Sequence, residues 1–100
     1  RYEQDGYLCD THTAVAFRVA EACRGEAPMV VLSTASPFKF PRDVLAALGT
    51  QAPSGDFAAM AALEKKTGAC APQSLRELDR KPVRFSEIIA PEEIRAAALR

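Results

Sequence analysis

The sequence is poor in the residues that bind metals. It has one histidine and three cysteines in 100 residues. Cys9, Cys23 and Cys70 are widely spaced and form no Cys-x-x-Cys pair, and His12 has no partner at the spacing of metal ligands. We therefore expect no metal site. We also expect reduced cysteines, as is typical of a cytoplasmic protein.

The sequence also lacks an excess of charge of either sign and a long apolar run. Thirteen basic and thirteen acidic residues cancel, and no basic cluster stands out. Nucleic acid is disfavoured as a partner, because its phosphates require a basic face. No apolar run approaches the roughly 20 residues that cross a membrane, and the polar N-terminus does not resemble a signal peptide. The length suits one small domain with a modest core.

Capping residues and apolar spacing predict several helices. Asp10 or Thr11 is a candidate N-cap for a helix over residues 11–24, because a short side-chain oxygen accepts from the free amides of a first helical turn. A proline is favoured in the first turn of a second helix, over residues 41–48. Apolar residues three apart predict a third helix over residues 56–67. A helical turn near residues 72–80, an extended segment near 82–89 and a final helix from residue 91 complete the prediction.

The apolar run at residues 29–34 predicts a strand. It shows no alternation of apolar and polar residues, so it is typical of a strand that is covered on both faces in a parallel sheet. A helix followed by such a strand predicts an α/β fold that is rich in helix, with one or two buried parallel strands. We divide the chain into the end of an α/β domain, residues 1–50, and a helical extension, residues 51–100.

One buried strand needs neighbouring strands, and this chain hardly supplies them. The chain also opens on Arg1 rather than on methionine. We therefore expect it to be the C-terminal part of a longer α/β protein.

Two groups of polar residues are candidates for binding a ligand. Ligands gather at the carboxyl ends of strands in parallel sheets, where Ser33 and Thr34 are expected to lie. Asp10 and His12 stand at the start of the first helix. Each residue has a purely structural alternative: a helix cap for the aspartate, a structural role for the histidine, bonds to loop amides for the hydroxyls, and solvation for the loop lysine, Lys39. No nucleophile elbow or phosphate-binding glycine loop is present, so the residue pattern alone leaves these alternatives open.

Two motifs together resemble the threonine synthase family. They are GYLCDTHTAVA, residues 6–16, and PMVVLSTASPFKFP, residues 28–41. The family typically shows Gly-Tyr…Asp-Pro-His-Thr-Ala-Val-Ala and then Val-Val-Leu-Ser-Thr-Ala-(His or Ser)-Pro-(Ala)-Lys-Phe-Pro, in this order. The sequence departs from that pattern at Thr11, where proline is usual, and at Phe38, where alanine is usual. Ser36 occupies a position that is often histidine.

The resemblance implies the C-terminal part of a fold-type-II pyridoxal-phosphate lyase of threonine biosynthesis. Such an enzyme converts O-phosphohomoserine and water into threonine and phosphate. The resemblance places Thr34, ahead of Ser33, at the ring nitrogen of pyridoxal 5'-phosphate. It also implies that Asp10 and His12 shape the cofactor pocket, and that Lys39 attracts the phosphate of the substrate.

The resemblance implies no catalytic residue within these 100 residues. In the family, a lysine forms the internal aldimine and a loop rich in serine, glycine and asparagine holds the cofactor phosphate. Lys39, Lys65, Lys66 and Lys81 lack the sequence context of that lysine. We therefore expect the chain to be inactive alone and to depend on the rest of the same polypeptide. The alternatives are another fold-type-II pyridoxal-phosphate lyase or dehydratase, or a non-catalytic binding or assembly module.

Overall fold

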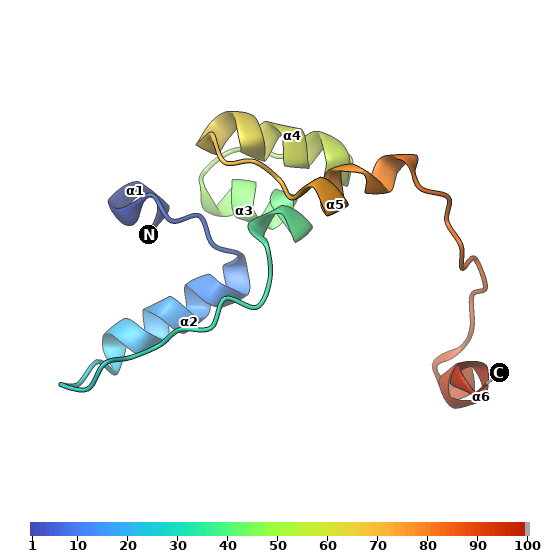
Figure 1. Ribbon diagram of the computed structural model, residues 1–100, viewed down its shortest axis with the longest axis horizontal. Helices are drawn as coiled ribbons and strands as arrows, with labels where there is room; N and C mark the ends of the chain where they lie inside the picture. The colour runs from blue at the N-terminus through green and yellow to red at the C-terminus, as the bar shows by residue number, and fades with distance from the viewer. Residues whose placement is uncertain (100) are drawn as a thin grey trace.

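The computed structural model describes residues 1–99, and within these residues the chain forms helices and no strand (Figure 1). The α-helices are α1 (Tyr2–Asp5), α2 (Thr11–Ala22), α3 (Pro41–Ala47), α4 (Asp56–Thr67), α5 (Gln73–Arg76) and α6 (Ile94–Ala98). Three short 3₁₀ helices accompany them: η1 (Pro37–Lys39), η2 (Leu78–Arg80) and η3 (Pro91–Glu93).

The ends of the longer helices follow from local hydrogen bonding. Helix α2 begins at Thr11 because the side chain of Asp10 accepts hydrogen bonds from the first free amides. It ends at Ala22 rather than at residue 24. Helix α4 covers the predicted residues and ends where Gly68 takes a φ of 70°, a left-handed conformation that glycine adopts without strain.

The hydrophobic core lies between η1, α3 and α4. Leu45 of α3 and Leu63 of α4 are fully buried. Residues three and four apart share one face of a helix, so Ala59 and Met60 join Leu63. Val44 is buried next to Leu45 in the same core. The remaining buried apolar residues are Phe38 and Ala71. The core thus contains residues from both predicted parts of the chain, and the division at residue 50 stays a prediction.

The predicted buried parallel strand at residues 29–34 is wrong, and so is the α/β fold class. This segment has no regular secondary structure, and Val30 is 83% exposed and Leu32 75% exposed. A strand is stable only when its amides and carbonyls pair with a neighbour, and residues 1–99 include no second strand that would provide this pairing. The apolar run therefore remains extended and unpaired.

The molecule is elongated, because two parts of the chain extend away from the core (Figure 1). It measures 51 × 33 × 22 Å, with a radius of gyration of 17.5 Å. A compact domain of this length has a radius of gyration of about 13 Å. The first extension, which we call the arm, consists of α2 and the returning residues 23–36; Met29 and Val31 line a shallow cavity together with Phe17 of α2. The second, which we call the tail, is residues 82–99.

Candidate functional site

A buried carboxylate organises the start of α2. Asp10 is fully buried and Thr13 is 3% exposed. Oδ1 of Asp10 accepts hydrogen bonds from the backbone amides of His12 (2.9 Å) and Thr13 (3.3 Å), and Oδ2 accepts one from the Thr13 hydroxyl. Both carboxylate oxygens therefore have partners within the protein, and the cap that the sequence predicts is present.

These hydrogen bonds keep Asp10 ionised. The bond from the Thr13 hydroxyl is the main cause that lowers the pKa of Asp10 below its ordinary value of 3.8, and the two amides act in the same direction. Burial opposes them because it disfavours a charged carboxylate. The hydrogen bonds prevail, so Asp10 carries a negative charge at neutral pH.

The structure brings His12 and Lys39 to the same region through Phe40. The imidazole Nδ1 of His12 lies 3.3 Å from Oδ1 of Asp10, while the side chain is 76% exposed. The ring centres of His12 and Phe40 are 5.7 Å apart, and Nζ of Lys39 is 5.9 Å from the centre of the Phe40 ring. Phe40 is not among the site residues that the sequence predicts. The aromatic residue between a lysine and a helix-starting proline was the available signal.

Ser33 and Thr34 present their hydroxyls to the outside. Both are exposed, and neither has a hydrogen-bond partner among the described residues. They lie along the arm between Val31, which is beside α2, and the loop that contacts His12. Ser36 has a local explanation, since its Oγ accepts a hydrogen bond from the amide of Phe38 (3.3 Å) and caps η1.

Lys39 and Phe40 line an open cleft of about 730 Å³ beside this site. Arg42 contributes a second basic side chain to the cleft, and Asp43 and Asp56 contribute acidic ones. The cleft therefore combines charged and apolar surface, and its two basic side chains are matched by two acidic ones. The role of Lys39 in attracting an anion stays a prediction.

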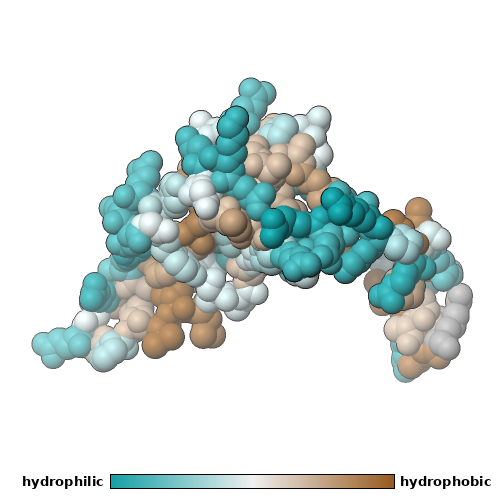
Figure 2. Space-filling model, turned by 45° about the horizontal axis from the view of Figure 1, so that its top comes forward, coloured by the Kyte–Doolittle hydropathy of each residue, from teal (hydrophilic) through white to brown (hydrophobic). Residues whose placement is uncertain are grey.

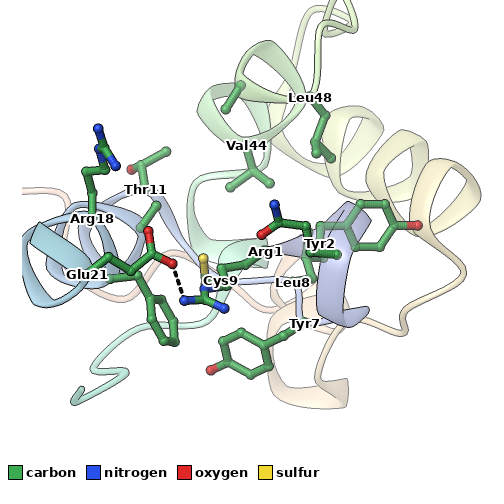
Figure 3. A pocket seen from close by; sticks show the side chains of 14 residues that line it. Arg1, Tyr2, Tyr7, Leu8, Cys9, Thr11, Arg18, Glu21, Val44 and Leu48 are labelled. Carbon is green, nitrogen blue, oxygen red and sulfur yellow. Dashed lines mark hydrogen bonds and ion pairs between the residues drawn. The ribbon is translucent and has the colours of Figure 1, made fainter. Parts of the chain in front are cut away.

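A smaller cavity of about 300 Å³ lies between α1, α2 and α3, and contains none of the predicted site residues (Figure 3). An ion pair between Arg1 and Glu21 crosses it. The guanidinium of Arg1 also lies 5.2 Å from the centre of the Phe17 ring, which contacts Tyr7 edge to face. These contacts hold α1 against α2, so the cavity is a packing feature of the arm.

The part of the chain that the structure describes contains no candidate metal site. No three histidine, cysteine, aspartate or glutamate side chains gather there in a way that would hold an ion. The three cysteines are free thiols. None of the helices formed by residues 1–99 has the length and hydropathy that crossing a bilayer requires.

Two comparisons with known proteins agree on one family. The sequence family described as "Threonine synthase, C-terminal" matches residues 13–97. A threonine synthase from Pseudomonas aeruginosa is 47% identical to the chain over 55 residues, which are 53% of this chain and 12% of that protein. The aligned part is thus a small portion of that relative. No solved structure matches the chain.

Proposed function

The chain belongs to the family of threonine synthase C-terminal domains, and we propose that the complete polypeptide containing it converts O-phosphohomoserine and water into threonine and phosphate. The observation that carries this proposal is the family match over residues 13–97, which includes the core and most of the arm and of the tail. The aligned relative extends far beyond these residues. The activity is therefore proposed for the whole polypeptide and not for this part alone.

The proposed cofactor is pyridoxal 5'-phosphate, held in part by Thr34 and Ser33. Their hydroxyls suit a ring nitrogen, because they are exposed, lack partners among the described residues, and both donate and accept hydrogen bonds. The chemistry that the group supplies when bound is stabilisation of negative charge at the substrate carbon next to the amino group.

A neutral hydroxyl has a specific consequence at that nitrogen. Thr34 donates or accepts a hydrogen bond there without carrying charge. A carboxylate in the same place would favour a protonated ring and a stronger withdrawal of electrons. We therefore propose that Thr34, ahead of Ser33, moderates this withdrawal, which suits a γ-elimination followed by the addition of water.

The other predicted residues support the site in two ways. Asp10 has both oxygens engaged, so its proposed role is to hold the start of α2, and with it His12, in the wall of the pocket. Lys39, which lines the open cleft, is proposed to attract the phosphate of the substrate. The proposed location is the cytoplasm, which suits the free thiols.

The direct test is a phosphate-release assay on the complete polypeptide with pyridoxal 5'-phosphate. We expect release of phosphate from O-phosphohomoserine, with threonine formed in equal amount. Serine and threonine serve as the control substrates. Ammonia released from either of them, without phosphate release from O-phosphohomoserine, would assign the protein to the dehydratases instead.

Thr34→Val in the complete enzyme is expected to lower kcat about tenfold, the equivalent of one lost hydrogen bond of about 1.4 kcal/mol. The absorbance of the bound cofactor is expected to shift as well. The unfolding midpoint should not change, because Thr34 is exposed and has no hydrogen-bond partner among residues 1–99. Thr34→Ser keeps the hydroxyl and is the matched control. If kcat and absorbance both stay at their original values in Thr34→Val, then Thr34 does not contact the cofactor.

A further inference from the structure

The tail exposes large apolar side chains along its whole length. Phe85 is 83% exposed and Ile88 is 96% exposed. Val83, Ile94 and Leu99 are exposed too. Single exposed apolar residues are common on protein surfaces, but a succession of them in one segment indicates a surface that packs against another part of a protein.

The first half of the tail is an irregular segment that exposes apolar side chains. Residues 82–90 have no regular secondary structure and connect η2 to η3 (Figure 1). Side chains alternate between the two sides of an extended chain. On that pattern Val83 and Phe85 lie on one side, and Ile88 lies on the other together with Arg84 and Ser86. Apolar side chains are thus present on both sides of the segment, which suits a groove that encloses it.

The second half of the tail has local order of its own. The amide of Ala90 donates to Oε2 of Glu93 (2.9 Å), and the amide of Glu93 donates to the carbonyl of Ala90 (3.0 Å). This reciprocal pair, with Pro91 in the first turn, defines where the terminal helical turns begin. The tail thus combines an apolar extended segment with a short helix, which is not the composition of a polar linker.

The tail also lies apart from the other apolar surface of this chain. Figure 2 shows apolar surface on the arm and on the tail, with more polar surface between them. The exposed large apolar residues of the arm are Val15, Val19, Met29, Val30 and Leu32. Figure 1 places the arm and α6 on opposite sides of the core, so the tail is not covered by the other residues that the structure describes.

We propose that the tail is a docking strap that packs, through Val83, Phe85 and Ile88, on the part of the same polypeptide outside these 100 residues. The family match continues to residue 97, so nearly the whole tail belongs to the shared domain rather than to an appended linker. The aligned part is 12% of the relative's length, which leaves a large body of chain to provide the groove. The proposal rests on the family membership used under the proposed function, and not on the reaction.

Hydrogen exchange on the complete polypeptide tests the strap. The backbone amides of residues 82–90 are expected to exchange at least about a hundredfold more slowly than in an unstructured peptide, because docking protects them. The protection should be the same at low and high protein concentration, since the groove belongs to the same polypeptide. The double variant Phe85→Ser, Ile88→Ser is expected to lose at least about tenfold of that protection. Ser86→Ala removes no apolar side chain from the same segment, so it is the matched control and should keep the protection.

Three outcomes would overturn the proposal. Exchange of residues 82–90 at the unprotected rate in the unsubstituted protein would show that nothing covers the tail, even if the double variant failed to fold. Protection that appears only at high concentration would assign the groove to a second copy. If Val19→Asp alone removed the protection of residues 82–90 while the core stayed protected, the groove would be assigned to the arm. Phosphate release, measured on the same samples, reports separately on the proposed function.

Discussion

Replacing Leu63 with alanine is expected to lower the free energy of unfolding of the chain by about 2–5 kcal/mol. Leu63 has no exposed surface and packs in the same core as Leu45. Alanine would remove buried methyl groups and leave a cavity between α3 and α4, whose packing holds the core together. Few other buried apolar residues are available to compensate, so a loss of this size is a large part of the stability of a small domain.

Urea unfolding followed by far-ultraviolet circular dichroism measures this loss. Leu78→Ala is the matched control, since Leu78 is 49% exposed and sits outside the core. Its free energy of unfolding should change by no more than about 0.5 kcal/mol. Equal losses in the two variants would show that the core between α3 and α4 does not stabilise the chain.

Replacing Asp10 with alanine is expected to cost about 1–3 kcal/mol of unfolding free energy. The change removes the N-cap of α2, and it leaves the buried hydroxyl of Thr13 without its acceptor. Thr13→Val removes the other partner, so the double variant should cost less than the sum of the two single ones. Strict additivity of the two single variants would show that the Asp10–Thr13 contact contributes nothing.

Lowering the pH is expected to reproduce part of the loss of unfolding free energy that Asp10→Ala causes. The pKa of Asp10 is lower in the folded chain than its ordinary value of 3.8, chiefly because of the Thr13 hydroxyl. The ionised carboxylate thus stabilises the fold above pH 3.8, and this contribution disappears as the pH falls from there through the folded pKa. Unfolding free energies measured across this range should fall less steeply in Asp10→Asn than in the unsubstituted chain. Identical slopes would mean that Asp10 is not responsible.

Features that depend on nearby residues could be predicted from the sequence. Asp10 caps α2 and Gly68 ends α4 through hydrogen bonds and backbone conformation within a few residues. The two motifs at residues 6–16 and 28–41 could also be recognised without a structure, and they led to the threonine synthase family.

Features that depend on distant residues could not be predicted. An apolar run reports that a segment prefers apolar surroundings, but not whether a partner is present, so the predicted strand at residues 29–34 is an exposed, unpaired segment. The contact between His12 and Phe40, which joins the start of α2 to the Lys39 loop, is formed by residues far apart in the chain. The sequence by itself determined the start of α2, the end of α4 and the family, because capping and motif identity are local. Only the tertiary structure decided which apolar residues are buried and which polar residues meet, because both depend on how distant segments pack.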